Sequence, residues 1–357
     1  MQSCPVLRRT LDSVMLSSST TAGQSFERKV WGMHTNKAGV AVIGGGLAGL
    51  SAANSLTEAN VAVMLFERNS TLGGRLGSDT QTDMGAQYFT ARHPAFRQAC
   101  REWEADGWIA EWSPRLYRHD LEQGLRPSSD DIQRLVGVPG MATLADHLQQ
   151  SFARQQATIT QLQQATDGEW ILQAADGAEY GPFTAVVLAI PPASAAELLY
   201  AAPSLQQDVA RVRMRPCWSL AMTFEQPLPT QVDACFVRDG PLDWLARNNS
   251  KPQRAGNESW VLQSTSTWAE QHEHDQPARV ITELSRAMEQ ITGLTLPAPS
   301  SSQARYWAQA RPAEELKWGA LAAPRLNLYI CGDWCLGGRM ENAWLSGRQA
   351  AKALLDS

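Results

Sequence analysis

The sequence has 357 residues, of which 43% are hydrophobic and 19% charged, as in a globular protein with one large or two medium domains. The formal net charge of −5 and the lack of any Lys/Arg-rich run argue against binding to nucleic acid. No run of about 18 apolar residues occurs, so no membrane-spanning helix is expected. The six cysteines form no CxxC pair, which favours reduced thiols and a cytoplasmic location.

The first 37 residues differ in composition from the rest of the chain. They are rich in Ser and Thr, contain Asp12 and Glu27 as their only acidic residues, and show no hydrophobic periodicity, so we expect residues 1–37 to be disordered. Residues 1–32 have the composition of a transit peptide, which would direct the protein to an organelle. The interpretation that we favour is a start at Met33, a few residues before the first predicted strand.

A βαβ pattern follows this extension. Residues 37–43 form a short apolar run that ends in glycines, residues 47–58 have helical spacing, and residues 61–66 form a second apolar run. Two strands joined through a helix predict the beginning of a parallel sheet.

The elements after this unit alternate between helical and strand-like patterns. Residues 96–112 combine charged and aromatic residues at helical spacing, and the polar stretch 113–131 predicts turns at the beginning of an inserted domain. The remaining predicted elements are, in chain order, a helix at 147–156, strands at 158–162, 169–174 and 185–190, alternating strands at 218–224 and 259–266, a helix at 278–291, a buried strand at 326–331 and a last helix at 342–355.

A GxGxxG motif lies directly between the first predicted strand and the first predicted helix. Gly44 allows a tight turn, Gly46 lets the backbone approach a pyrophosphate, and Gly49 allows the helix to pack closely on the sheet. The N–H groups and dipole at the start of the helix favour a phosphate. Glu67 ends the second strand, where its carboxylate would accept hydrogen bonds from a ribose. The motif in this context predicts dinucleotide binding.

Features further along the chain favour FAD over NAD. Gly73, Gly74 and Arg75 form a second glycine pair with an arginine that could face the same diphosphate. Asp333 follows the last predicted strand, where it could bind the ribityl hydroxyls or close on the phosphates. The helix that begins near Asn342 could stabilise negative charge on a reduced flavin. Because the chain contains a single GxGxxG motif, any reductant must enter the substrate site itself.

The order of these patterns predicts an α/β fold, in which an FAD-binding Rossmann-like domain of the glutathione-reductase type carries an inserted α+β substrate domain. The FAD-binding domain is expected to be discontinuous, with residues 38–95, 135–200 and 319–357. The substrate domain is expected to comprise residues 96–134 and 201–318.

Residues 83–92, 241–248 and 331–347, together with the glycine motifs, carry a longer resemblance. Over roughly residues 38 to 355 the chain resembles the flavin-containing amine oxidase superfamily and, within it, the bacterial renalase-like group. The resemblance implies noncovalent FAD, hydride transfer from a dihydronicotinamide isomer to flavin N5, and reoxidation by O2 to give H2O2. One stretch departs from the group, because residues 305–307 read Arg-Tyr-Trp where the group tends to have His-Arg-Trp. This departure leaves the substrate open.

The motifs and the resemblance together predict the site residues. The predicted cofactor-binding residues are Gly44, Gly46, Leu47, Ala48, Gly49, Glu67, Arg68, Gly74, Arg75, Gly85, Ala86, Gln87, Ile159, Asp333, Asn342 and Ala343. The predicted catalytic residues are Gln87, Tyr88, Arg305, Trp307 and Trp344. Because the chain has 13 Trp, the rings of Tyr88, Trp307 and Trp344 could instead simply pack in the core. Cys331 or Cys335 could lie near the flavin or be tethered to it, but we favour idle thiols, and we predict no metal site.

Three functions remain to be compared. The first is an FAD-dependent oxidase that takes dihydronicotinamide dinucleotides (NAD(P)H isomers) and O2, which needs no catalytic base because no O–H or N–H proton must leave. The phosphates of such a dinucleotide substrate would bind the cations Arg305, Arg311, Lys317 and Arg339. The second is an FAD-dependent amine oxidase or desaturase that acts on another small molecule. The third is a non-catalytic flavin-binding module. The protein is expected to be a monomer or a dimer.

Overall fold

The glycine-rich motif lies at the centre of a six-stranded sheet in the computed structural model, which describes residues 29–30, 39–77, 82–149 and 152–357. Apart from the short strand β1 (Lys29–Val30), the extension predicted at residues 1–37 lies outside the described residues. The sheet contains, in spatial order, β18 (Leu321–Ala323), β19 (Leu328–Ile330), β12 (Ala185–Leu188), β2 (Val40–Ile43), β3 (Val63–Glu67) and β8 (Ala153–Gln156). Neighbouring strands are parallel, except for the antiparallel pair β18 and β19.

Both faces of this sheet are covered at its inner strands β19, β12, β2 and β3, which explains why these strands read as apolar runs. In β2, Val40 and Val42 face a core made with helices, whereas Ala41 and Ile43 face a second core on the other side. The helices of the first core are α1 (Leu47–Glu58), α2 (Pro94–Ala105), α3 (Thr143–Leu148) and α8 (Met340–Leu355). The second core is closed by β9 (Ile159–Gln164), β10 (Trp170–Ala174), β11 (Glu179–Phe183), α4 (Pro192–Leu198) and α5 (Pro203–Ala210).

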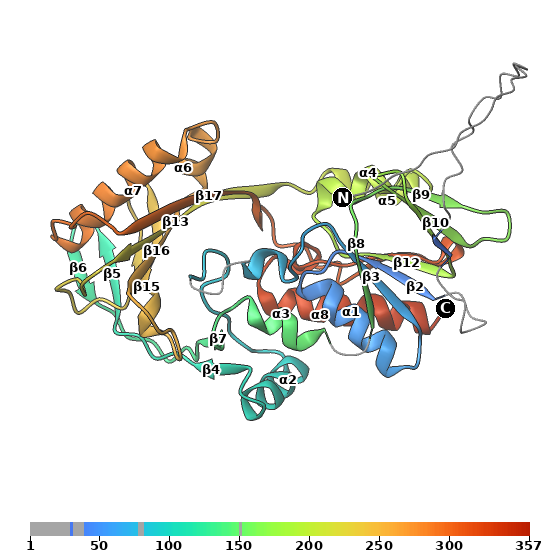
Figure 1. Cartoon of the computed structure of the whole chain (residues 1–357), viewed down its shortest axis with the longest axis horizontal. Helices are drawn as coiled ribbons and strands as arrows, with labels where there is room; N and C mark the ends of the chain where they lie inside the picture. Colours follow the sequence, from blue (N-terminus) through green and yellow to red (C-terminus); the bar gives the residue numbers. More distant parts are fainter. Residues whose placement is uncertain (1–28, 31–38, 78–81, 150–151) are drawn as a thin grey trace, which may run out of the picture.

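A seven-stranded sheet forms the other end of the molecule (Figure 1). It contains, in spatial order, β17 (Ser301–Pro312), β13 (Met214–Phe224), β16 (Glu258–Ser264), β15 (Leu242–Arg247), β14 (Ala234–Val237), β5 (Leu116–Asp120) and β6 (Gly124–Pro127). One face packs against α6 (Ser266–Gln271) and α7 (Pro277–Thr292). Helix α7 buries Val280, Leu284 and Met288 at a spacing of four, which gives it one apolar stripe toward the sheet.

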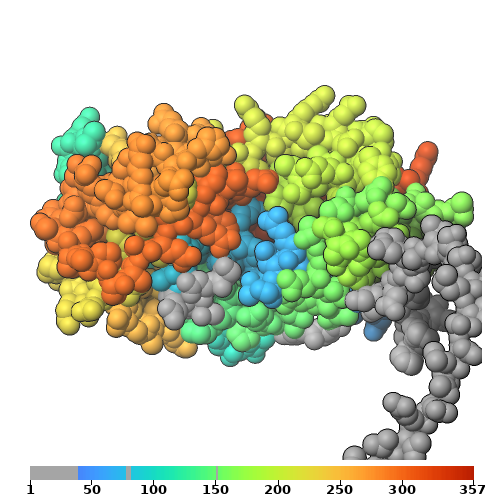
Figure 2. Space-filling view, turned by 45° about the horizontal axis from the view of Figure 1, so that its top comes forward, coloured from blue at the N-terminus to red at the C-terminus, as the bar shows by residue number. Residues whose placement is uncertain are grey.

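The space-filling view shows both ends of the molecule on one face. In Figure 2 the orange surface around α7 lies at one end, and the yellow-green surface around α4 and α5 lies toward the other end, next to the green surface. Strands from 96–134 and from 201–318 share the seven-stranded sheet, as the proposed substrate domain requires, whereas α2, at the start of the first of these segments, packs in the first core of the six-stranded sheet. A short pair of strands, β4 (Ile109–Glu111) and β7 (Leu135–Gly137), lies where the chain passes between them.

Three local predictions were wrong. The helix predicted at 147–156 is replaced by the end of α3 at Leu148 and by strand β8, because an edge of the parallel sheet supplies hydrogen bonds that local helical spacing does not reveal. The helical stretch 96–112 ends at Ala105, before Gly107 with φ 74° turns the chain into β4. The turns predicted at 113–131 contain the hairpin of β5 and β6. None of the helices in the described ranges is long and apolar enough to cross a membrane.

Candidate cofactor and active site

The glycine motif makes the turn from β2 into α1. Gly44 has φ 110°, and a Cβ there would collide with the carbonyl oxygen of Ala189, so only glycine fits. A Cβ at Gly49 would collide with the carbonyl oxygen of Gly44, which shows how closely the helix approaches the strand. Gly46 differs, because no atom lies within 4 Å of the place where its Cβ would be. The backbone at Gly46 therefore faces open space, as an approach by a diphosphate requires.

Glu67 is fixed beside this turn at the end of β3. Its side chain is 8% exposed, and Oε2 accepts a hydrogen bond of 2.8 Å from the N–H of Gly45. Oε1 accepts two more bonds of 2.8 Å from the backbone and side chain of Asn69. The backbone carbonyl of Glu67 accepts from the N–H of Ala157, two residues before Ile159. The carboxylate is thus preorganised close to the start of α1.

The second glycine pair lies against the first. The N–H of Gly73 donates to the carbonyl of Gly45 at 2.9 Å, and Gly73 has φ 104°. Arg75 follows in the short helix η1 (Gly74–Leu76) and forms an ion pair with Asp333 of η4 (Asp333–Leu336), in which Nη1 donates to Oδ2 at 3.0 Å and Nη2 to Oδ1. The structure therefore brings together Gly46, Gly74, Arg75 and Asp333, although they come from both ends of the chain.

These residues fit FAD. The open space at Gly46 would be filled by any side chain, and α1 has no side-chain cap, so its first N–H groups keep their capacity to bind a phosphate. Leu47 and Ala48 supply the first residues of that helix, and Glu67 supplies a buried carboxylate for ribose hydroxyls. Bound FAD would supply the hydride-accepting ring, and these residues would hold its diphosphate and ribose.

Residues 82–89 connect the cofactor side to the seven-stranded sheet. The backbone of Ala86 donates to the carbonyl of Arg75 at 3.0 Å. From the sheet, Gln263 Nε2 donates to the carbonyl of Gly85 at 2.8 Å, and Trp307 Nε1 donates to the carbonyl of Met84 at 3.1 Å. Gly85 cannot carry a side chain, because its Cβ would collide with the backbone of Arg75. The segment 82–89 is therefore hydrogen-bonded to η1 on the cofactor side and to β16 and β17 of the seven-stranded sheet on the other.

Arg305 and Trp307 form one unit on β17. The Arg305 guanidinium carbon lies 3.8 Å from the centre of the Trp307 ring, which is the geometry of a cation–π contact. Burial lowers the pKa of Arg305 from its ordinary value. The predicted catalytic residues Arg305, Trp307 and Gln87 are thus gathered around the segment 82–89, whereas their roles in a reaction stay predictions.

Tyr88 lies in a group of aromatic rings. Its ring centre is 5.6 Å from Trp244 and 6.2 Å from Trp112, and the Arg134 guanidinium carbon lies 5.2 Å from it. Burial raises the pKa of Tyr88, while the charge of Arg134 opposes that rise. Tyr88 is therefore neutral near pH 7 and presents a ring with a polar tip.

A buried ion cluster of Asp83, Lys251 and Arg254 lies beside Gln87 and was missed by the sequence patterns. Asp83 Oδ2 accepts from Lys251 Nζ at 2.9 Å and from Arg254 Nη2 at 2.8 Å, and all three side chains are at most 2% exposed. Oδ1 accepts from the N–H of Met141 at 2.9 Å. Lys251 Nζ also donates to Gln87 Oε1 at 3.3 Å, and Gln87 Nε2 donates to the carbonyls of Asp83 and Gly85.

The cluster carries two cations for one carboxylate. Burial alone would raise the pKa of Asp83, but Lys251 and Arg254 hold it below its ordinary value. Burial lowers the pKa of Lys251, and Asp83 opposes that effect. Asp83 begins one of the stretches that carry the family resemblance, but nothing in the sequence pattern of Lys251 and Arg254 identifies it as their partner.

Several predicted residues lie apart from this group. Among the described residues, the ring contacts recorded for Trp344 are with Phe96, at 5.4 Å between ring centres, and with Arg348. Trp344 is 7% exposed and belongs to the core around α8, which favours the packing alternative. Ile159 is buried in the second core, and Arg68 is exposed at the end of β3.

Side chains at the start of α8 fix the neighbouring segments, whereas no side chain caps the helix itself. Asn342 Nδ2 donates to the carbonyl of Leu336 at 2.6 Å, and the N–H of Ala343 donates to the carbonyl of Arg339 at 3.1 Å. Glu341 Oε1 accepts from the N–H groups of Arg92 and His93 at 2.7 and 2.5 Å. Arg339, an exposed residue with φ 80°, directly precedes the helix.

The cysteines near Asp333 are unsuited to attack on a flavin. Cys331 and Cys335 are fully buried. Burial raises the pKa of Cys331 to about 12 and that of Cys335 well above its ordinary value. Because the thiolate is the reactive form, this environment favours the idle thiols that we expected.

Comparisons with known proteins agree with the class of FAD-binding protein that the fold and the site indicate. A family model described as "Flavin containing amine oxidoreductase" matches residues 108–355, and one described as "NAD(P)-binding Rossmann-like domain" matches residues 42–103. Polyamine oxidase 5 of Oryza sativa subsp. japonica is 33% identical over 120 residues, a match that covers 30% of this chain and 23% of that protein. The matched part is thus less than a quarter of that relative's length.

Two solved structures share the fold across most of both chains. Cyclohexylamine oxidase from Brevibacterium oxydans IH-35A has a TM-score of 0.72 at 12% identity and covers 90% of this chain and 99% of its own. Wild-type putrescine oxidase bound to putrescine has a TM-score of 0.67 at 11% identity with the same coverage. At these identities the likeness shows a shared fold. That the protein is an FAD-dependent oxidoreductase follows from the family model over residues 108–355. Because the first family model spans more than half of the sequence, the chain belongs to the flavin containing amine oxidoreductase family.

Proposed function

We propose that this oxidoreductase oxidises dihydronicotinamide dinucleotides, isomers of NAD(P)H, with O2 as the electron acceptor. The substrate gives up a hydride, and its two electrons end on O2, so that one dihydronicotinamide, one O2 and one proton yield one nicotinamide cation and one H2O2. FAD supplies the hydride acceptor when it is bound. The proposal rests on the charge of the site.

The buried carboxylates of the site are already engaged. Asp83 is matched by two cations, and Asp333 by Arg75. Glu67 and Glu341 accept hydrogen bonds from N–H groups of the protein. None of these four carboxylates therefore remains to pair with a cationic amine and compensate the loss of its hydration. Arg305 adds a positive charge, which favours a phosphate group. This observation favours an anionic substrate.

The residues around 82–89 would then act by positioning. Trp307 and Gln263 hold the carbonyls of Met84 and Gly85, and Lys251 orients the amide of Gln87. No group needs to remove a proton from carbon, because the hydrogen leaves with its electron pair. Orientation in a water-poor site can supply much of the rate enhancement of such a step.

An amine oxidase or desaturase is the second candidate. It is favoured by the rings of Tyr88, Trp112 and Trp244, since aromatic faces can receive an amine. The two solved relatives named above are a cyclohexylamine oxidase and a putrescine oxidase, which also suggests amine chemistry.

Anaerobic stopped-flow mixing decides between the two. We expect dihydronicotinamide dinucleotides to bleach the bound flavin and O2 to restore its colour with one H2O2 for each turnover, whereas cyclohexylamine and putrescine leave it oxidised. Arg305→Ala should raise the half-saturating dinucleotide concentration, and added salt should mimic part of this effect, because exposed charges are screened over about 8 Å at physiological ionic strength. Rapid bleaching by an amine, with none by any dihydronicotinamide, would overturn the proposal in favour of the second candidate.

A further inference from the structure

A row of side chains crosses the seven-stranded sheet on the face away from α7. Successive partners in register from β17 to β5 are Arg305, Ser219, Gln263, Trp244, Phe236 and Arg118. Directly opposed residues on neighbouring strands share a face. The adjacent row, which includes Ala304, Leu262 and Tyr117, packs in the core with α7, so the row from Arg305 to Arg118 must point the other way.

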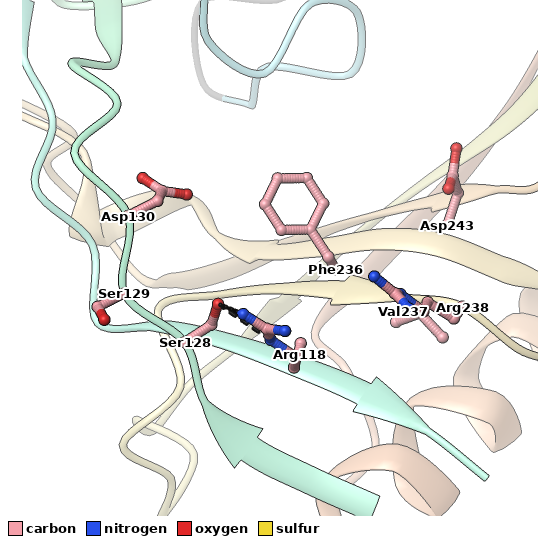
Figure 3. Close-up of a pocket in the computed structure, with 8 residues that line it drawn as sticks. All are labelled: Arg118, Ser128, Ser129, Asp130, Phe236, Val237, Arg238 and Asp243. Atoms are coloured by element: carbon pink, nitrogen blue, oxygen red, sulfur yellow. Dashed lines mark hydrogen bonds between the residues drawn. The ribbon is translucent and has the colours of Figure 1, made fainter. Parts of the chain in front are cut away.

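A pocket lies where this row ends, at β14 and β5 (Figure 3). It has a volume of about 370 Å³ and is lined by Arg118, Ser128, Ser129, Asp130, Phe236, Val237, Arg238 and Asp243. The Phe236 side chain stands up from the sheet in Figure 3 and is 37% exposed, so it offers a ring on which another ring could stack. Arg118 Nε and Nη2 both donate to the hydroxyl of Ser128, at 3.2 and 3.0 Å.

The pocket has an excess of positive charge. Asp130 is neutralised by Arg134 through two hydrogen bonds of 2.8 and 2.7 Å. Asp243 is paired with Arg311 at 3.1 Å. Within the described ranges, no ion pair to a carboxylate is recorded for Arg118 or for Arg238. An anion that enters the pocket would therefore meet two cations whose charge is not already neutralised at salt-bridge distance.

We propose that this pocket is an outer subsite for the far nucleotide of the substrate, with its phosphate at Arg118 and Arg238 and its base on Phe236. The inference rests on the proposed function and identifies the part of the site that selects an elongated substrate. Gln263, which holds the carbonyl of Gly85, is three strand spacings from Arg118, or about 14 Å. A small amine bound near Gln263 cannot reach that far.

The test uses the full-length FAD-loaded protein and two matched substrates. Arg118→Met removes the charge but keeps most of the side-chain length, and Phe236→Ala removes the ring. Arg279→Met is the control, because Arg279 lies on α7, across the sheet, and pairs with Glu283 on its own helix. The half-saturating concentration for flavin bleaching is measured with a dihydronicotinamide dinucleotide and with the corresponding mononucleotide.

We expect Arg118→Met to raise the half-saturating concentration of the dinucleotide by about tenfold or more, the effect of losing one charge-assisted hydrogen bond, and to leave that of the mononucleotide unchanged. Calorimetry with adenosine monophosphate should show binding that weakens in the same variant. Phe236→Ala should bind adenosine monophosphate no more tightly than it binds inorganic phosphate. The control should change none of these values, and Arg118→Met should melt at the temperature of the wild type, whereas Phe236→Ala also loses the ring contact with Trp244 at 4.7 Å and should melt somewhat lower.

The outcomes separate this inference from the proposed function. If dihydronicotinamides bleach the flavin but Arg118→Met affects both substrates equally or neither, the subsite is wrong and the proposed function stands. If no dihydronicotinamide bleaches the flavin but adenosine monophosphate binds in an Arg118-dependent way, the subsite stands and the proposed function is wrong. Failure of adenosine monophosphate to bind the wild type at millimolar concentration also overturns the subsite.

Discussion

The two ends of the molecule build their sites by different means. Around the glycine turn, the shape comes from backbone close to backbone, since Gly44 and Gly49 each exclude a Cβ by contact with a carbonyl group. On the seven-stranded sheet, the site that we propose would come from side chains, with Arg305 and Arg118 at the two ends of a row that crosses six strands. The segment 82–89 lies between the two and is bonded to both.

This difference predicts how each end responds to substitution. A backbone site depends on a few neighbouring glycines. A side chain added at one of them should therefore either destabilise the fold, where it collides with backbone, or prevent cofactor binding, where it enters the cofactor's space. A side-chain site is spread over separate strands, so single substitutions should have graded effects. The experiments below test that contrast, from the largest expected effect to the smallest.

The largest effect is expected from Gly46→Val. The residue has ordinary backbone angles, φ −76° and ψ 175°, and open space around it, so the apoprotein should keep its melting temperature. FAD binding should weaken by about 10⁴-fold or more, because the new side chain would block several N–H groups, each of which contributes about 1.5–3 kcal/mol when it binds a charged phosphate. Flavin absorbance for each protein molecule after dialysis measures the loss.

Gly49→Ala is the matched control for this experiment. Its added Cβ would collide with the carbonyl of Gly44, so here the melting temperature of the apoprotein should fall. If Gly46→Val unfolds the apoprotein, or keeps its FAD, then the open space at Gly46 is not a diphosphate site.

The next effect is expected from Asp83→Asn, which leaves Lys251 and Arg254 buried without their carboxylate. Loss of one partner from a buried ion pair typically costs about 3–5 kcal/mol of unfolding free energy. Lys251→Met keeps the pair of Asp83 with Arg254 and should cost much less. Denaturant unfolding of both variants checks the order, and equal losses would contradict it.

The same cluster gives a pH dependence. Because the pKa of Asp83 is lowered in the folded protein, its contribution to stability should be present above the unfolded value of about 3.9 and lost as pH falls through the folded value. The pKa of Lys251 is lower in the folded protein than in the unfolded chain. At a pH between these two values, the unfolded chain therefore binds more protons at Lys251 than the folded protein does. Wild-type stability relative to Lys251→Met should therefore rise as pH increases toward about 10.4.

A smaller effect is expected from Glu67→Ala. Loss of the ribose hydrogen bonds should weaken FAD binding by about 1–3 kcal/mol, if the carboxylate accepts them in the buried position that it occupies. Titration of apoprotein with FAD measures the change. Unaltered affinity in Glu67→Ala would mean that this carboxylate serves only the turn around Gly45 and Asn69.

The smallest effect is expected from Trp307→Phe on the substrate side. The variant keeps a ring under Arg305 but loses the hydrogen bond to the carbonyl of Met84, which should cost about 0.5–1.5 kcal/mol of unfolding free energy. FAD affinity should stay unchanged. A loss of FAD as large as that expected for Gly46→Val would contradict the contrast between backbone and side-chain sites.

The sequence predicted the cofactor end better than the substrate end. Helix α1 begins and ends where the spacing predicted, and the strands before and after it were found because both carry continuous apolar runs. Strand β8 was mistaken for helix, since only the partner strand β3 reveals its hydrogen bonds. The hairpin of β5 and β6 was mistaken for turns for the same reason.

The sequence by itself determined the class of cofactor, because a turn made by glycines that adjoin one another leaves a local pattern. Gly44, Gly46 and Gly49 lie within six residues, and their spacing already expresses the geometry that the phosphate needs. Only the tertiary structure decided which distant side chains meet. Asp83 meets Lys251 across 168 positions of the chain, and Arg118 shares a row with Arg305 through strand register alone. Such contacts are fixed by strand pairing and burial, which a single sequence does not encode as a local pattern.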